Sequence, residues 1–350
     1  METGNISRRL EELGPVSAEA ARSYSRAFSR IRSVVEEKLA IDLPGDDEFV
    51  RSSSEHFGRS LEAVYAYSLW RALVLETAGL AAGLSSRGMS GRLSYLLRVW
   101  VLAVSSSVKP PELYELTGPL EILREHAGEL EEAAVSMDAD RPSCHSAFIE
   151  HILGGRIDDA AGEARSSLDR LGSVDSVLES VFYPALAEVG GRWRENSIGI
   201  AEEHAATAAL RAAAHRFFDS VPSRKGHSME VAVACVPGDE HDIGAEILAL
   251  YLESAGWPVY FIGHSTPEAE MIREIERGGY GAVLLSVSMV RHLPSLERLA
   301  ATIRERRPGI RIVSGGGALS LGAGVMDRVA DATAATPADA DRVLTEMEGG

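Results

Sequence analysis

The chain has 350 residues, a formal net charge of −17 and two cysteines. Its length allows two or three domains of ordinary size, each able to bury a core. The negative charge opposes nonspecific association with nucleic acid, whose phosphates require a cationic surface, and no helix-turn-helix with a basic recognition helix is evident.

The remaining global features favour a cytoplasmic protein. Two cysteines, Cys144 and Cys235, exclude a disulfide framework and suggest a reducing compartment. The first residues lack the charged start and apolar region of a signal peptide, and no apolar run reaches the ~18 residues of a membrane helix. We therefore expect a soluble, cytoplasmic protein without a membrane partner.

Residues 1–140 have helical periodicity over 16–40, 46–85, 89–107 and 117–136, and no convincing strand. This predicts an all-α domain of about six helices, with a globin-like arrangement as one option. One interpretation of its aromatic, histidine and arginine residues is a pocket for a planar, carboxylated tetrapyrrole. The other is ordinary helical core with solvated arginines, since aromatics at helical spacing usually pack. The residues concerned are Tyr65, Tyr67, Trp70, Tyr95, Trp100, His56, Arg92 and Arg98.

Residues 141–224 form a second predicted unit, bounded by turn-rich stretches at 138–142 and 221–226. Apolar residues recur at helical spacing over 145–220. Breaks at 154–155, 171–173 and 196–199 divide this stretch into four helices.

Residues 225–350 alternate strands with helices. Strands are predicted near 230–236, 258–262, 281–286, 310–314 and 331–334, which is a doubly wound, five-stranded parallel α/β pattern. Right-handed crossovers place the loops after the first, third and fourth strands along one edge of the sheet. The whole chain is thus predicted to be multidomain, α followed by α/β.

A chemically informative motif follows the first strand. Asp239, His241 and Gly244 form an Asp-x-His-x-x-Gly pattern where that strand gives way to a helix. A metal-bound imidazole must be neutral and held in one tautomer, and a carboxylate two residues earlier can accept its other N–H. Glycine leaves room for close approach of a bulky ligand. The alternative is a histidine in an ordinary loop, with Asp239 as a turn or cap residue.

Two further features lie at the carboxyl ends of predicted strands: Ser286 with Ser288, and Gly315-Gly316-Gly317. With the first motif, they resemble the cobalamin-binding domain of methionine synthase, corrinoid methyltransferase proteins and B12-dependent mutases. In that family, Ser-x-Leu and Gly-Gly follow the histidine motif, and here Ser288 occupies the leucine position. The resemblance covers 230–317. It implies base-off cobalamin, with His241 as the lower cobalt ligand and the nucleotide tail buried near Ser286.

The helices before this domain then look like a cap. Trp193 and the pair Glu203-His204 have a Trp-x9-Glu-His spacing. It resembles the cap of adenosylcobalamin photoreceptors, best known as light-sensing repressors of carotenoid synthesis, in which these residues surround the adenosyl group. Singly, Trp193 can be core, Glu203 a first-turn acid favoured by the helix dipole, and His204 a surface residue. An aromatic wall and a carboxylate do suit an adenine ring and ribose hydroxyls.

One position departs from the carotenoid repressors. The residue after their tryptophan is a histidine that captures cobalt after illumination, and here it is Arg194. A guanidinium cannot ligate cobalt. The illuminated state is therefore expected to be water-ligated or to use another donor, with His204 the nearest candidate by sequence.

An all-helical domain ahead of such a module resembles the photocobilins, light sensors that carry both B12 and biliverdin. This resemblance rests on domain order, and it implies noncovalent biliverdin in residues 1–140. The favoured function is a noncatalytic light sensor with adenosylcobalamin, whose conformation or homo-oligomeric state changes on illumination. A corrinoid carrier of a methyltransferase system is the alternative, and the cobalamin-binding portion of a radical mutase a further one.

Overall fold

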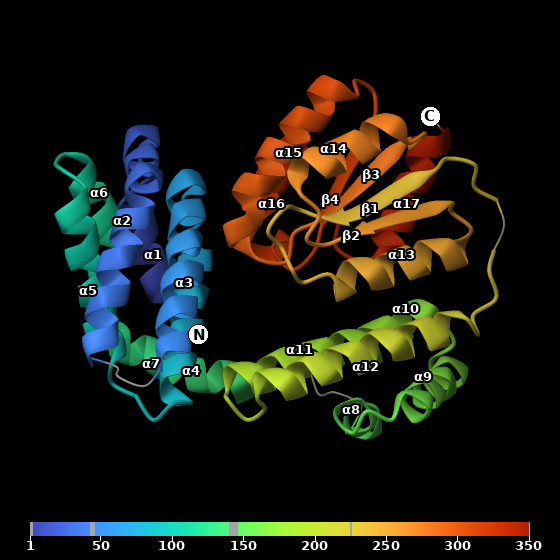
Figure 1. Cartoon of the computed structure of the whole chain (residues 1–350), viewed down its shortest axis with the longest axis horizontal. Helices are drawn as coiled ribbons and strands as arrows, with labels where there is room; N and C mark the ends of the chain where they lie inside the picture. Colours follow the sequence, from blue (N-terminus) through green and yellow to red (C-terminus); the bar gives the residue numbers. More distant parts are fainter. Residues whose placement is uncertain (1–2, 43–45, 140–145, 225, 350) are drawn as a thin grey trace. The chain divides into compact units, whose positions relative to one another are not determined.

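The computed structural model describes residues 3–42, 46–139, 146–224 and 226–349. The chain divides into two compact units, Met1–Asp140 with Arg194–Asn196, and Arg141–Trp193 with Ser197–Gly350 (Figure 1). The predicted units 141–224 and 225–350 pack together within the second compact unit, and their separation into two domains stays a prediction. No helix in the described ranges is both long and apolar enough to cross a membrane.

The first unit is entirely helical in its described part, as predicted, but it has seven helices there rather than about six. The first helix lies outside the predicted helical stretches. The stretch 46–85 divides at Ser68, which has a left-handed φ of 55° and ends one helix just before the next begins. The helices are α1 (Thr3–Glu12), α2 (Ala18–Asp42), α3 (Asp47–Tyr67), α4 (Trp70–Ser85), α5 (Leu93–Ser107), α6 (Glu112–Glu125) and α7 (Ala127–Ala139).

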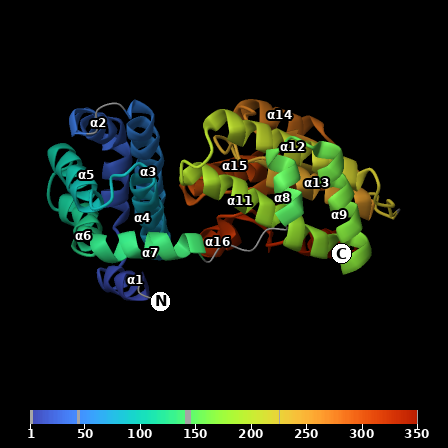
Figure 2. The ribbon, with the colours of Figure 1, turned by 90° about the horizontal axis from the view of Figure 1, so that it is seen from below.

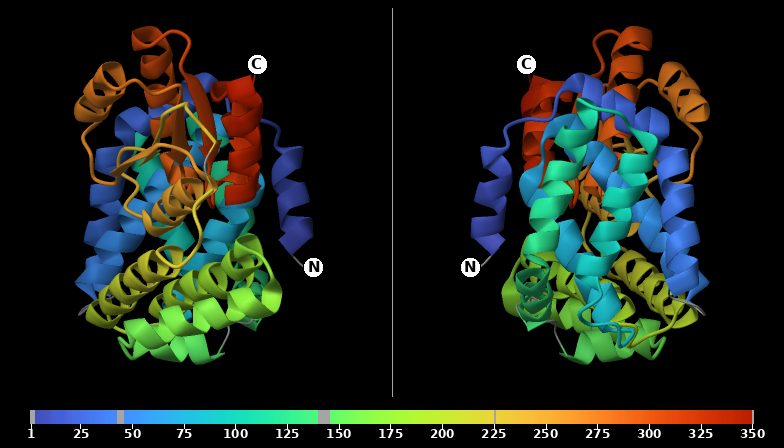
Figure 3. Two further views of the ribbon diagram at one scale, coloured as in Figure 1. Left: turned by 90° about the vertical axis from the view of Figure 1, so that its right-hand side faces the viewer. Right: turned by 90° about the vertical axis from the view of Figure 1, so that its left-hand side faces the viewer.

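Aromatic side chains form the core of this unit, where α2 packs on α3 and α5 (Figure 3, right). Tyr65 is fully buried, packs edge-on against Tyr24 at 5.0 Å between ring centroids, and donates its hydroxyl to the Leu116 carbonyl at 2.7 Å. Trp100 packs edge-on against Phe57, and Trp70 is also buried. These rings are structural core.

The second unit begins with the four predicted helical segments, separated at the predicted breaks. They are α8 (Ser146–Leu153), α9 (Ile157–Leu171), the run α10–η1–α11 (Val174–Val177, Leu178–Phe182 and Tyr183–Arg194) and α12 (Ile200–Phe218). Gly155, Gly172 and Asn196 take positive φ values at the breaks, which is why the helices end there. We call residues 146–218 the cap. Seen from below, α8 and α9 lie across α12 (Figure 2).

The five predicted strands are all present and form one parallel sheet in the order β2-β1-β3-β4-β5. They are β1 (Val231–Cys235), β2 (Val259–Gly263), β3 (Ala282–Ser286), β4 (Arg311–Gly315) and β5 (Ala332–Ala334). The β1 side chains are buried throughout, as expected for a strand covered on both faces.

Helices cover both faces of the sheet (Figure 3, left). One layer contains α13 (Ile243–Ala255) and α17 (Pro337–Gly349), and the other contains α14 (Glu268–Arg277), α15 (Leu293–Arg306) and α16 (Leu319–Val329). The α12 helix of the cap packs on α13, and a continuous apolar core joins the cap to β1 and α13. This is the doubly wound α/β architecture that the sequence predicted, with ligand-binding loops expected at the carboxyl ends of the strands.

Candidate functional site

The three sequence motifs meet at one edge of the sheet. Cys235 of β1 pairs with Ser286 of β3, and Ser286 pairs with Gly315 of β4, so the three strands end in one row. Beyond the row, the Val236 N–H donates to the Ser286 carbonyl at 3.1 Å, and the Val287 N–H donates to the Gly315 carbonyl at 2.8 Å. The loops after β1, β3 and β4 therefore start side by side, as the strand order predicted.

Asp239 and His241 are held together in the first of these loops. The Asp239 side chain is fully buried, whereas the His241 side chain is 56% exposed. Asp239 Oδ1 lies 2.9 Å from His241 Nδ1 and also accepts the His241 backbone N–H at 3.2 Å. With Nδ1 engaged by the carboxylate, Nε2 on the opposite side of the ring is the nitrogen left for a metal.

The second oxygen of Asp239 binds the loop after β3. Ser288 donates its backbone N–H to Oδ2 at 2.6 Å and its hydroxyl to the His241 carbonyl at 3.3 Å. Burial raises the pKa of Asp239, but the hydrogen bonds from His241 and from the Ser288 N–H outweigh it, and the net pKa lies below its ordinary value. Asp239 is therefore a buried, ionised carboxylate that closes a turn on the His241 N–H and also binds the loop after β3.

Gly244 is exposed in the first turn of α13, and a Cβ added there would meet no atom within 4 Å. Nothing within the protein requires glycine at this position, because the space is open. An exposed imidazole whose other ring nitrogen is held by a buried carboxylate is a donor that would suit the cobalt of a corrinoid.

The glycines at the end of β4 and just after it have a different role. An added Cβ would lie 2.5 Å from the Ala334 carbonyl oxygen at Gly315, 2.6 Å from the Val287 carbonyl oxygen at Gly316, and 2.8 Å from the Ser288 carbonyl oxygen at Gly317. Gly316 also has a φ of +102°. Gly316 and Gly317 let the loop after β4 pack directly on the backbone of the loop after β3, and Gly315 lets the end of β4 lie close to β5.

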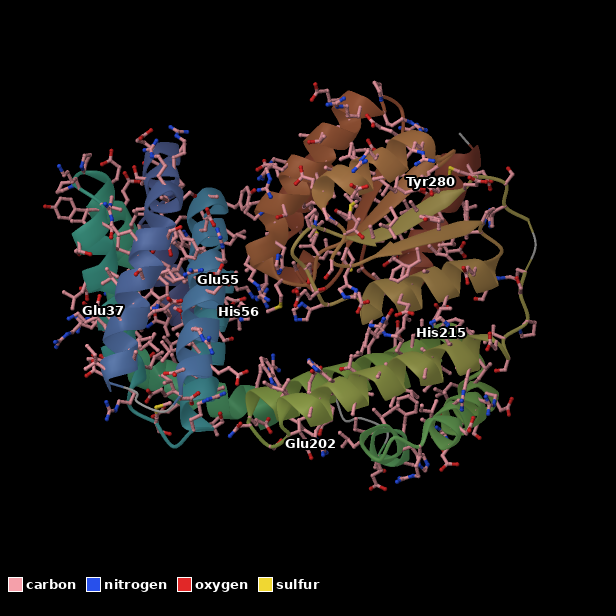
Figure 4. The ribbon with its side chains drawn as sticks, viewed as in Figure 1. Glu37, Glu55, His56, Glu202, His215 and Tyr280 are labelled. Carbon is pink, nitrogen blue, oxygen red and sulfur yellow. The ribbon has the colours of Figure 1, made fainter. Side chains whose placement is uncertain are left out.

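The residues expected to surround an adenosyl group, Trp193, Glu203 and His204, lie in the cap. Trp193 is near the end of α11 and 42% exposed, which is unusual for a core aromatic. Glu203 and His204 lie near the start of α12, with side chains 25% and 74% exposed. Glu202, not Glu203, caps the helix: its carboxylate accepts the Gly199 N–H at 2.8 Å, and Figure 4 shows it on the side of α12 turned away from the sheet. Glu203 instead accepts the Thr207 hydroxyl at 2.7 Å.

Some residues around the site were not found from the sequence. Arg211 on α12 and His264 after β2 both contact Asp242, the residue that follows His241. Asp242 is separated by 31 residues from Arg211, and Ser288 by 49 from Asp239. No local pattern contains such pairings, because only the fold brings them together.

Comparisons with known proteins agree with this geometry. Residues 229–336 match a family model described as "B12 binding domain", and residues 146–216 match a second model with the same description. The chain carries cobalamin-binding domains. The site at the strand ends therefore belongs to a segment that binds a corrinoid cofactor.

Several curated proteins resemble this chain. The HTH-type transcriptional repressor CarH of Myxococcus xanthus is 28% identical over 176 residues, which is 50% of this chain and 57% of the repressor. The repressor CarA of the same organism is 28% identical over 121 residues, 34% of this chain and 38% of CarA. The chain thus spans less than two thirds of either repressor.

Corrinoid proteins are similar as well. Dimethylamine corrinoid protein 1 of Methanosarcina acetivorans is 26% identical over 161 residues, 45% of this chain and 74% of that protein. The solved structure of the Methanosarcina barkeri monomethylamine corrinoid protein superposes with a TM-score of 0.48 at 18% identity, covering 57% of this chain and 95% of that one.

The residues that could line a tetrapyrrole pocket in residues 1–140 differ from one another in burial. Tyr65, Trp70 and Trp100 are buried in the helical core, which agrees with the core interpretation of these rings. Tyr95 is partly buried and donates its hydroxyl to Asp42. The remaining members of the set are exposed or partly exposed, namely His56, Tyr67, Arg92 and Arg98. Cys144 lies outside the described residues.

Proposed function

We propose that the chain is a light sensor that binds adenosylcobalamin with His241 as the lower cobalt ligand. The observation that carries this proposal is the pair of Asp239 and His241, in which a buried carboxylate fixes an exposed imidazole at the carboxyl edge of the sheet. The B12-binding domain match over the same residues supplies the corrinoid class.

The cap supports the adenosyl form and the light response. Trp193 presents an exposed aromatic face, and Glu203 has a carboxylate that is not used in capping its helix. An indole can pack on adenine and exclude water, and a carboxylate can accept hydrogen bonds from ribose hydroxyls. The similarity to CarH and CarA agrees with this assignment.

When bound, adenosylcobalamin supplies a cobalt–carbon bond that visible light breaks. The protein's part is to favour different conformations before and after the adenosyl group leaves. Trp193 and Glu203 would contact this group in one state only, and such differential contacts are what shifts a conformational equilibrium. The output is a change of conformation or of homo-oligomeric state, without a catalytic reaction and without nucleic acid.

The test uses the full chain loaded with adenosylcobalamin and kept in darkness. Green illumination should change its sedimentation coefficient, and Trp193→Ala should reduce the change without abolishing cobalamin binding. Identical profiles in dark and light would contradict the sensor function. His204→Ala distinguishes the ligands of the illuminated state, since an unchanged bis-histidine spectrum would exclude His204.

A corrinoid carrier in methyl transfer is the second candidate, favoured by the similarity to dimethylamine corrinoid protein 1. A carrier must expose its cobalt to partner enzymes, and it would bind methylcobalamin at least as well as adenosylcobalamin. The two functions are separated by the relative dissociation constants of these cobalamins. The sensor predicts a clear preference for the adenosyl form and its rapid photolysis when bound.

Biliverdin in residues 1–140 is a separate part of the proposal and rests on domain order alone. Because the rings of Tyr65, Trp70 and Trp100 are buried, a bilin site would have to be formed by other residues of this unit. Its test is a dark absorption spectrum of protein produced with biliverdin available. A band in the red supports a bilin, and a spectrum of cobalamin alone contradicts it.

A further inference from the structure

A cluster of charged side chains connects the cap to the helix that follows His241. Arg211 of α12 places Nη2 2.7 Å from Asp242 Oδ1 and Nη1 3.1 Å from Glu246 Oε2. His215, one turn further along α12, lies 2.7 Å from Glu246 Oε1, and Figure 4 shows it between α12 and α13. His264 lies 2.7 Å from Asp242 Oδ2. One guanidinium thus bridges two carboxylates on α13.

The carboxylates of this cluster are poorly solvated. The side chain of Asp242 is 6% exposed and that of Glu246 is 13% exposed, whereas that of Arg211 is 36% exposed. Removing one partner of a buried ion pair is costly, because it leaves a charge that water cannot solvate. Loss of the guanidinium with α12 still packed on α13 would leave both carboxylates poorly solvated and without this cation. The guanidinium therefore stabilises the contact between α12 and α13.

Asp242 also belongs to the loop between β1 and α13 that contains His241 (residues 236–242), which we call the His241 loop. Asp242 is the residue after His241, and it is the N-cap of α13. The loop is consequently held at two points: the Ser288 N–H binds Asp239 on one side of His241, and Arg211 binds Asp242 on the other. The position of the imidazole depends on both.

Arg211 and His204 lie on the same side of α12. His204 and Arg211 are seven residues apart, which is about two helical turns, or roughly 10 Å along α12. Residues at this spacing lie on one side of a helix.

We infer that Arg211 is a positioning residue for the lower cobalt ligand: by bridging Asp242 and Glu246, it fixes the His241 loop and holds α12 beside it. This inference rests on the proposed ligation by His241. It assigns to the cap a role at the lower face, in addition to the contacts proposed for Trp193 and Glu203 at the upper face.

The experiment compares Arg211→Leu, Arg211→Lys and a matched control, Arg216→Leu. Arg216 lies on the same helix but pairs with Asp158 inside the cap. In the cofactor-free protein, hydrogen–deuterium exchange over residues 237–246 should be faster in Arg211→Leu than in wild type or the control. The exchange rate of Arg211→Lys should be intermediate. The lysine ammonium is a point charge and replaces only in part the two contacts that the planar guanidinium makes with Asp242 and Glu246.

A second measurement reports the ligand itself. Cob(II)alamin is added to protein labelled with ¹⁵N-histidine, and the nitrogen splitting in the electron paramagnetic resonance spectrum gives the fraction with a protein imidazole on cobalt. Arg211→Leu should lower this fraction and weaken cob(II)alamin binding about 10- to 100-fold, the usual effect of losing an outer-sphere partner. Arg211→Lys, which keeps the charge, makes the test informative if the leucine variant does not fold.

The outcomes are distinguishable. A wild-type ¹⁵N splitting that survives unchanged in both Arg211 variants, together with control-like exchange, overturns the inference and leaves the proposed ligation standing. A wild-type protein without the splitting overturns the ligation and the inference with it.

Discussion

Asp239 binds both the ring and the backbone of His241 through a single carboxylate oxygen, with Oδ1 2.9 Å from Nδ1 and 3.2 Å from the backbone nitrogen. Its other oxygen accepts the Ser288 N–H. One buried carboxylate therefore fixes the tautomer of the imidazole, the course of its loop and the contact between two loops.

Asp239→Asn should weaken cobalamin binding about 10- to 100-fold. An amide that accepts from His241 through its oxygen presents its NH₂ group to the Ser288 N–H, so two donors face each other. The measurement is a dissociation constant by absorbance titration. Glu240→Gln is the matched control, because Glu240 lies between the two motif residues and is exposed. Equal losses in both variants would contradict the role of Asp239.

Substitution by alanine should affect the stability of the fold differently at two glycines, Gly316 and Gly244. Gly316→Ala is expected to destabilise the fold by about 1–3 kcal/mol, because its φ of +102° and the nearby Val287 carbonyl both oppose a side chain. Gly244→Ala meets open space in a helical first turn, and it should leave stability unchanged or raise it by up to about 1 kcal/mol.

The binding measurement completes this comparison. Gly244→Ala should reduce cobalamin affinity despite its intact fold, because the added methyl group enters space kept for the ligand. Chemical denaturation and titration of the same preparations give both quantities. If Gly244→Ala binds cobalamin like wild type, the ligand does not approach this residue closely.

The thiol of Cys235 should be inert. It is 1% exposed at the end of β1, and burial, with a further contribution from Asp239 and Asp242, raises its pKa to about 12. The thiolate is the reactive form, and almost none is present at pH 8. Peptide mapping after iodoacetamide treatment of the native protein should find residue 235 unmodified, with full modification after denaturation. Rapid native labelling would show that β1 opens readily.

Glu348 should make stability depend on acid pH. Hydrogen bonds from His227 and from the Ser228 and Met229 backbone N–H groups lower its pKa to about 2, from an ordinary value of 4.5. The depressed pKa means that this stabilisation is present above about pH 4.5 and is lost as the pH falls toward 2.

The variant Glu348→Gln tests this dependence. It should melt below wild type at pH 7, and the difference in melting temperature should shrink between pH 4.5 and 2. Glu346→Gln, on the exposed side of the same helix, is the control. If the difference in melting temperature between Glu348→Gln and wild type stays constant from pH 4.5 to pH 2, ionisation of Glu348 does not contribute to stability.

The sequence predicted the second unit well because its signals are local. Buried strands appear as continuous apolar runs, and the cap helices end at residues such as Gly172 and Asn196 that take positive φ. In the first unit, the division at Ser68 has no glycine or proline to mark it, and the sequence did not predict it.

The site could be predicted only in part, because some of its contacts join residues that are far apart in the sequence. Asp239 and His241 are two residues apart, and their relation follows from spacing. Ser288 and Arg211 reach this loop from distant segments, so their partners depend on strand order and helix packing. For the aromatic set in residues 1–140 the sequence left a pocket and ordinary core as alternatives, because helical spacing alone does not show where a ring packs, and Tyr65, Trp70 and Trp100 are buried in the core.

The central claim is the bond between cobalt and His241, and the most direct measurement is the absorption spectrum of adenosylcobalamin bound to wild type and to His241→Ala. We predict a base-off, imidazole-ligated spectrum for wild type, and for the variant a base-off spectrum without imidazole together with a large loss of affinity. An unchanged spectrum and an unchanged dissociation constant in His241→Ala would contradict the account.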